Sequence, residues 1–226
     1  PLVKVWVLPN RGPGIVKCWG YAPAPVPDVF AEMVAPGFQH ALALLPDGTV
    51  QAWGNNSYLQ AFVPPGLSNV VQVAAGDYFS LALKSDGTVV GWGQNSSGQA
   101  TPPPGLDDVI AIVAGVNHAL ALEANGAIVA WGAASYTAVP AGLPPSVVIA
   151  AGPTYSLALS TNGQVKAWGT SGSPTNVPAS VTNIAAVAAA ASGACGLNAA
   201  GQLVPWGSFP TAPTNATNVI SLAAGS

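Results

Sequence analysis

The stretch "AAGDYFSLALKSDGTVVGWG", residues 74–93, returns twice more in nearly the same form. Residues 34–54 read "VAPGFQHALALLPDGTVQAWG", and residues 113–132 read "VAGVNHALALEANGAIVAWG". The Trp-Gly pair that ends each copy recurs at intervals of 34, 39, 39, 37 and 38 residues. Its tryptophans are Trp19, Trp53, Trp92, Trp131, Trp168 and Trp206. A period near 40 residues with several short apolar runs in each copy is typical of a β-propeller or a solenoid.

Three strands are predicted in each repeat unit. In the unit that ends at Trp92 they are "NVVQVAAG", "FSLAL" and "TVVGWG". Between the second and third runs of four units stands an Asp-Gly or Asn-Gly pair, a combination that favours a tight two-residue hairpin with positive φ angles. These pairs are Asp47-Gly48, Asp86-Gly87, Asn125-Gly126 and Asn162-Gly163.

The ends of each unit predict how the strands are ordered around an axis. First strands end in small residues, as in "VAAG" and "IVAG", and small side chains suit a crowded centre, so we expect these strands innermost. Proline-bearing stretches such as "QATPPPGL", residues 99–106, follow each Trp-Gly loop. Because proline cannot donate to a ladder, we expect them to form a fourth strand at the sheet edge.

The two chain ends favour a closed ring over a solenoid. Residues 1–20 contain "VKVWVL" and a third strand ending at Trp19, without a first strand before them. Residues 218–226, "NVISLAAGS", read as a first strand with nothing after it. The sequence therefore predicts an all-β, six-bladed β-propeller, a single domain over residues 1–226. Unit one combines residues 1–20 with 218–226, units two to six lie within 21–217, and strands from both termini close the ring.

The string "GxxHxLALxxDGxVxxWG", which begins at Gly37 and again at Gly115, resembles the regulator of chromosome condensation type repeat, a propeller family. The short repeat is similar to the branch that includes the type II β-lactamase inhibitory protein and bacterial secreted repeat proteins. The resemblance implies a binding scaffold. Members that exchange nucleotides on a GTPase have longer repeats, a protruding wedge and a basic tail, which this sequence lacks. Unit six departs from the pattern, with Ala190 for the usual Gly and Gly193 at the His position.

The composition excludes several classes of partner. Only 6% of the 226 residues are charged, the net charge is −3, and the five cations are scattered, so no basic footprint for nucleic acid exists. Gly, Pro, Asn and Asp interrupt every apolar run before the roughly 18 residues of a membrane span. We expect no membrane insertion. A surface poor in Lys and Glu favours a secreted or cell-surface location, and a monomer is the expected state.

The loop segments that differ from one repeat unit to the next predict a binding face. The chain geometry places the loop between first and second strands and the loop after Trp-Gly on one face, while the hairpin turns lie on the other. Loops on a rigid scaffold are free to carry recognition, and aromatic residues anchor interfaces. The predicted binding residues are Phe38, Gln39, Asn56, Tyr58, Asp77, Tyr78, Asn95, Val116, Asn117, Tyr136 and Thr154.

Other chemistry-bearing residues favour structural roles. His40 and His118 share a position that Phe79 fills in another unit, which indicates packing, with one ring nitrogen bonded to backbone. No cofactor, metal ligand set, carboxylate pair or nucleophile elbow is indicated, so we expect no enzyme activity. The period of the tryptophans marks them as core between blades. The two cysteines, Cys18 and Cys195, either bridge neighbouring blades or are separate buried thiols.

Three functions fit these features. The first is a non-catalytic protein-binding or display module that uses the variable loop face. A lectin-like carbohydrate-binding module is the alternative, but sugar sites would repeat the same aromatic and polar set in most units. A structural spacer within a larger surface protein would show no anchor residues on that face at all.

Overall fold

The computed structural model describes residues 14–15, 30–170 and 172–208, and these form successive antiparallel β-sheets. Unit two contains β3 (Met33–Pro36), β4 (His40–Leu44) and β5 (Val50–Gly54). Unit three contains β6 (Val70–Ala75), β7 (Phe79–Lys84) and β8 (Val89–Gly93). Unit four contains β9 (Val109–Ala114), β10 (His118–Glu123) and β11 (Ile128–Gly132).

Units five and six repeat the arrangement. Unit five contains β12 (Ser146–Ala151), β13 (Tyr155–Ser160) and β14 (Val165–Gly169), and unit six contains β15 (Ile184–Ala189), β16 (Gly193–Asn198) and β17 (Leu203–Gly207). Two short 3₁₀ turns, η1 (Ala134–Tyr136) and η2 (Ser173–Thr175), follow β11 and β14. A two-stranded pair, β1 (Gly14–Ile15) with β2 (Phe30–Ala31), precedes unit two. In the part of the chain described, no helix is long and apolar enough to span a membrane.

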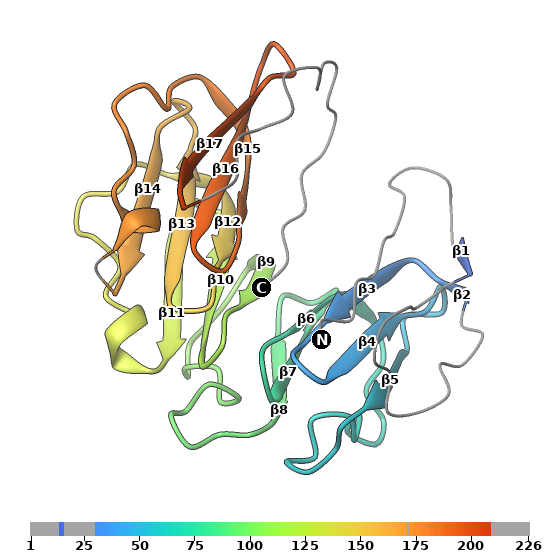
Figure 1. Cartoon of the computed structure of the whole chain (residues 1–226). Helices are drawn as coiled ribbons and strands as arrows, with labels where there is room; N and C mark the ends of the chain where they lie inside the picture. Colours follow the sequence, from blue (N-terminus) through green and yellow to red (C-terminus); the bar gives the residue numbers. More distant parts are fainter. Residues whose placement is uncertain (1–13, 16–29, 171, 209–226) are drawn as a thin grey trace.

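The five sheets follow one another around an arc in sequence order, from blue to red in Figure 1. First strands contact the first strands of the neighbouring units, β3 against β6, β6 against β9, and β9 against β12. Third strands form the opposite edge of each sheet. The prediction that the first strand is innermost is confirmed.

The prediction of a fourth strand at each sheet edge is wrong. Every described unit has three strands, and residues 99–106 run in turns between β8 and β9. Three consecutive prolines, Pro102 to Pro104, remove three backbone donors, so this segment cannot sustain a ladder even at an edge. It still covers the edge of its sheet, because Ala100 is buried and its carbonyl oxygen lies against Gly91 of β8.

The hairpin turns lie where predicted but have a different geometry. In unit two the amide of Gly48 donates to the Leu45 carbonyl and the amide of Leu45 donates to Thr49, which makes a three-residue loop. Gly48 has φ 76°, whereas Asp47 is outside the positive-φ region and accepts the Thr49 amide on its carboxylate. A type I turn followed by a left-handed glycine matches this pattern, so only the glycine needs positive φ.

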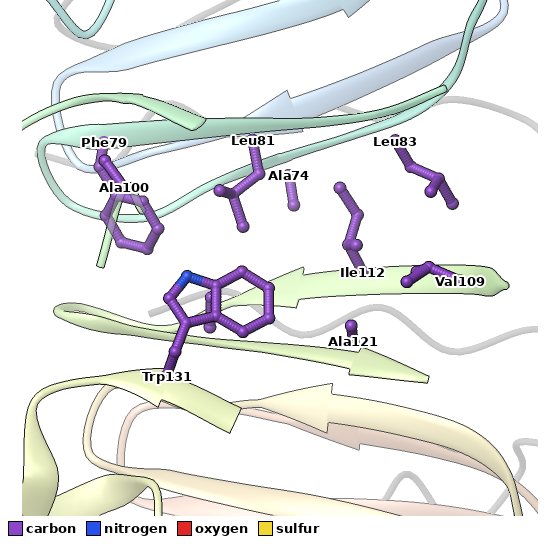
Figure 2. Close-up of a cluster of buried hydrophobic side chains, with 10 residues drawn as sticks. Ala74, Phe79, Leu81, Leu83, Ala100, Val109, Ile112, Ala121 and Trp131 are labelled. Carbon is purple, nitrogen blue, oxygen red and sulfur yellow. The ribbon is translucent and has the colours of Figure 1, made fainter. Parts of the chain in front are cut away.

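Four core clusters each lie between two neighbouring units, at what we call a seam, and a fifth lies between β2 and unit two. At the seam between units three and four, Trp131 packs with Phe79, Leu81 and Ile112, as Figure 2 shows. Trp92, Trp168 and Trp206 occupy the same place at the other seams. The predicted role of these tryptophans as core between blades is confirmed for the four of them.

The predicted ring closure lies outside the described residues. This holds for residues 1–13 and 209–226, which contain both segments predicted to complete unit one, and for Cys18 and Trp19. Its possible partner Cys195 is buried in β16, and burial raises the pKa of its thiol.

Candidate protein-binding face

Two loops of each unit lie on the same face of the sheets, which we call the loop face. In units two to six, the residue after the Trp-Gly pair donates its amide to a carbonyl in the loop between the first and second strands. In unit two, Asn55 donates to Gln39 at 2.7 Å, and in unit three Gln94 donates to Tyr78 at 2.8 Å. The same bond recurs in units four to six, from Ala133 to Asn117, from Thr170 to Thr154 and from Ser208 to Ser192. Both variable loops therefore share one face, as the chain geometry predicts.

The hairpin turns meet the chain entering the next unit, on what we call the turn face. Val70 donates its amide to the Gly48 carbonyl at 2.9 Å, and Ser146 donates to Gly126 at 2.9 Å. Three apolar residues are exposed here at β-bulges near the start of the first strands, namely Val71, Ile110 and Val147. They provide a matched apolar set away from the loop face.

Three aromatic rings from two units meet on the loop face. The ring centroids of Phe38 and Tyr78 are 5.9 Å apart, and those of Tyr58 and Tyr78 are 5.3 Å apart, at tilted or edge-on angles. Such distances are those of favourable aromatic pairs. Phe38 and Tyr58 remain 43% and 48% exposed. We call these three residues the aromatic cluster.

A hydrogen-bond network fixes loop 55–62, which carries Tyr58. The fully buried Gln60 accepts the Tyr58 amide on Oε1 at 2.9 Å and donates from Nε2 to Asn55 Oδ1 at 3.2 Å. Asn55 also donates to Gln39 Oε1, and Asn56 Oδ1 accepts the Ala61 amide at 2.9 Å. Because these side chains replace regular backbone pairing, the loop presents its apolar residues on a defined backbone.

Other predicted site residues lie apart from the cluster. Asn95 folds back to accept the Ala100 amide, and Asn117 accepts from Gln99 at 3.4 Å. Asp77 and Val116 lie at the seam between units three and four, where the Asp77 amide donates to the Val116 carbonyl at 3.4 Å. Tyr136 packs on His118 with centroids 5.2 Å apart. The predicted set is therefore spread along the face, and only Phe38, Tyr58 and Tyr78 form one group of rings.

Two exposed apolar residues of loop 55–62 are absent from the predicted set. Leu59 is 60% exposed and Phe62 is 56% exposed. The matching loop of unit three, 94–101, has Gly98 and Thr101 at these positions, so an alignment of the two loops would have singled both out. Leu59 also has φ 64°, a left-handed conformation that costs a non-glycine residue free energy.

Charges are nearly absent from the loop face. Apart from the buried histidines, Asp77 is the one acidic or basic side chain that the structure describes in its loops, and burial raises its pKa. Acidic and basic residues gather instead near the hairpin turns, namely Glu32, Asp47, Lys84, Asp86, Asp107, Asp108 and Glu123. Depletion of charge together with exposed aromatic rings is the composition of an interface core.

The two histidines are buried at seams. His40 Nε2 lies 2.9 Å from Ser80 Oγ, and His118 Nε2 lies 3.0 Å from Ser156 Oγ, in each case across to the next unit. The predicted packing role is correct. A serine hydroxyl is the hydrogen-bond partner of Nε2 in both rings, and backbone groups also favour the charged ring, those of Asp77 and Phe79 at His40 and that of Tyr155 at His118. Burial lowers the pKa of both imidazoles to about 4. Among the described residues, no group of three or more His, Cys, Asp or Glu could hold a metal ion.

Comparison with known proteins gives one family match and several similar folds. Residues 34–60 and 70–99 match the family model described as Regulator of chromosome condensation (RCC1) repeat. A search of curated protein sequences returns no significant match. Several solved structures are similar in fold.

The ectodomain of the receptor kinase CR4 from Physcomitrella patens is 24% identical with a TM-score of 0.78, over 98% of this chain and 64% of that one. The CRINKLY WD40 ectodomain of the Arabidopsis thaliana receptor kinase ACR4 is 24% identical with a TM-score of 0.75, over 93% and 81% of the two chains.

A third structure is Prp20p from Saccharomyces cerevisiae, described with its binding to Gsp1p and histones. It is 23% identical with a TM-score of 0.63, over 79% of this chain and 58% of that one. At these identities the likeness concerns the fold. Together with the repeated sheets, the family match shows that the chain carries RCC1-type repeats and has the fold of RCC1-like propeller proteins.

Proposed function

We propose that this chain is a non-catalytic protein-binding module whose loop face contacts another protein. The observation that carries the proposal is the aromatic cluster, in which Phe38, Tyr58 and Tyr78 meet from two units while Phe38 and Tyr58 stay exposed. Exposed aromatic residues on a fixed backbone lose little entropy on binding and dominate interface energetics. Leu59 and Phe62 add apolar area on the same loop.

The uneven distribution of rings supports a protein partner over carbohydrate. In unit three, Asp77 and Ser97 stand at the positions of Phe38 and Tyr58. At the position of Tyr78, units four to six have Asn117, Thr154 and Ser192, so the full aromatic set that a repeating sugar site would need is not repeated. One asymmetric footprint of this kind suits a single protein surface. The cluster also disfavours the structural-spacer hypothesis, which predicts no anchor residues on the loop face.

The remaining elements of the proposal concern the whole chain. A six-bladed ring closed by strands from both termini, one domain over residues 1–226, would account for the incomplete units read in residues 1–20 and 218–226. A secreted or cell-surface monomer fits the low content of charge. It also fits the likeness in fold to two receptor-kinase ectodomains.

The test is a pull-down from the native source with three forms of the chain. The wild-type chain should capture a protein that a variant with Phe38→Ala, Tyr58→Ala and Tyr78→Ala does not. The matched control, with Val71→Ala, Ile110→Ala and Val147→Ala on the turn face, should capture it as the wild type does. Individual changes at the cluster should cost about 1 to 3 kcal/mol of binding free energy. Loss with the turn-face variant instead, or binding to a glycan array alone, would refute the proposal.

A further inference from the structure

We propose that His40 makes the protein-binding loop sensitive to acid, so that protonation of its imidazole releases loop 55–62 and loosens the aromatic cluster. The inference rests on the proposed function in one respect, namely that this loop belongs to the binding face. The structural device itself is a chain of hydrogen bonds from a buried imidazole to that loop.

The chain of bonds has three links. His40 Nε2 lies 2.9 Å from Ser80 Oγ, and Ser80 Oγ donates to the Gln60 carbonyl at 2.8 Å. The side chain of Gln60 then holds the Tyr58 amide and Asn55. His40, Ser80 and Gln60 are all buried, so water does not compete for these bonds. The imidazole, on β4, therefore supports a loop of its own unit through a serine of the next.

The direction of these bonds fixes the protonation state of the ring. Because the single hydroxyl proton of Ser80 goes to the Gln60 carbonyl, Nε2 of His40 must carry the proton that points to Ser80. Nδ1 is then the bare nitrogen, and it is buried without a hydrogen-bond partner. A second proton on Nδ1 would create a buried cation, and the cost of burying that charge exceeds what the backbone groups of Asp77 and Phe79 return to it.

Release of the loop follows from this mismatch. A buried imidazolium gains free energy by moving toward water, and burial already lowers the pKa of His40 to about 4. Movement of the ring removes the donor to Ser80, and Ser80 is one of two donors to the Gln60 carbonyl, beside Trp92 Nε1. We therefore expect loop 55–62 to lose protection as the pH falls from about 6.5 toward about 4.

Few other titratable groups surround the ring. The loop between β6 and β7 brings Asp77, whose pKa burial raises, and the same loop brings Tyr78. Loop 55–62 brings Tyr58. Strands β3, β5 and β6 carry no acidic or basic residue, and Lys84 stands at the far end of β7, paired with Asp86. Among the residues that the structure describes, Asp77 is thus the one competing group, and it needs its own variant.

The molecule contains two internal controls. At the next seam, Phe79 and Ala119 replace the His-Ser pair, so loop 94–101 has the same backbone bonds without a titratable support. His118 bonds Ser156, but among the described residues no hydrogen bond leads from Ser156 to the loop after Trp131. Acid should therefore act on loop 55–62 and spare loop 94–101.

Hydrogen–deuterium exchange of the whole chain tests this, compared at about pH 7 and about pH 4 after correction for intrinsic exchange rates. The amides of Tyr58 and Ala61 should lose about tenfold or more of their protection at the lower pH, while loop 94–101 keeps its own. His40→Phe should abolish the loss, and His118→Phe should preserve it.

Equal loss in both loops, or a loss that persists in His40→Phe, would overturn the proposal. Abolition by Asp77→Asn would also overturn it, by assigning the response to the carboxyl group. If His40→Phe does not fold, the double variant with Ser80→Ala recreates the Phe79–Ala119 combination and takes its place. Because this readout needs no partner, a failed pull-down and a failed exchange test remain distinguishable.

Discussion

Loops 55–62 and 94–101 have the same hydrogen-bond skeleton but different surfaces. In each, a buried glutamine accepts the amide two residues before it, and its carbonyl accepts the indole N–H of the next unit, from Trp92 to Gln60 and from Trp131 to Gln99. Their exposed positions differ, since one loop has Tyr, Leu and Phe where the other has Ser, Gly and Thr.

The supports under the two loops differ as well. The Gln60 carbonyl accepts a second donor, Ser80, which is linked to His40, whereas Phe79 and Ala119 pack as hydrocarbon at the next seam. The shared skeleton supports the packing of these two seams, and it is not general, because Trp168 Nε1 is buried without a hydrogen-bond partner at the seam between units four and five. The differences in surface and support are therefore the places to look for function.

The largest effect should come from the part that the two seams share. Trp92→Ala and Trp131→Ala should each lower the free energy of unfolding by about 3 to 5 kcal/mol, since both remove a buried indole and its bond to a glutamine carbonyl. Chemical denaturation of the two variants measures this. Values that differ by much more than about 1 kcal/mol would break the equivalence of the two seams.

Acid should destabilise the two seams that contain a buried histidine. The pKa of His40 and of His118 is lowered from 6.5 to about 4, so the folded state binds fewer protons than the unfolded chain in this range. Stability is thus full above about pH 6.5 and falls as the pH drops toward about 4, by up to about 3 kcal/mol for each histidine. Chemical denaturation at several pH values in this range should show that the free energy of unfolding depends less steeply on pH in a variant with both histidines changed to Phe. An unchanged slope would mean that other groups titrate.

The His-Ser pair should behave as a unit. Ser80→Ala leaves the His40 N–H buried without its acceptor and should cost about 1 to 3 kcal/mol of stability. Adding His40→Phe reproduces the pair found at the next seam and should recover much of that loss. A double-mutant cycle measures the coupling. Additive effects of the two changes would contradict the direct contact.

The smallest effect concerns the exposed residue with a left-handed backbone. Leu59→Gly should raise the free energy of unfolding by about 1 kcal/mol, because glycine adopts φ near 64° without steric cost, as Gly98 does in the matching loop. The same change should weaken partner binding. Gly98→Leu, the reverse change, should destabilise by a similar amount. A destabilising Leu59→Gly would show that the leucine packs in the free protein.

Much of the fold could be predicted from the sequence, because it rests on local chemistry repeated along the chain. Alternation of apolar residues predicts the strands, Asp-Gly pairs predict the hairpins, and the period of the tryptophans predicts the core at the seams. The two faces also follow from strand direction alone. The turn type and the missing fourth strand were predicted incorrectly, because they depend on which backbone donors find partners, as at Asp47 and Pro102–Pro104.

Contacts across the seams were decided by tertiary structure. Nothing in the sequence pairs Tyr58 with Tyr78 or His40 with Ser80, since the residues of each pair belong to different units and meet only when neighbouring sheets pack. The exposure of Leu59 and Phe62 likewise depends on how loop 55–62 folds over Gln60. The sequence by itself determined the repeating frame, because hydrophobic period and turn residues act within one unit. Packing between units alone decided which side chains became a cluster and which histidine came to support it.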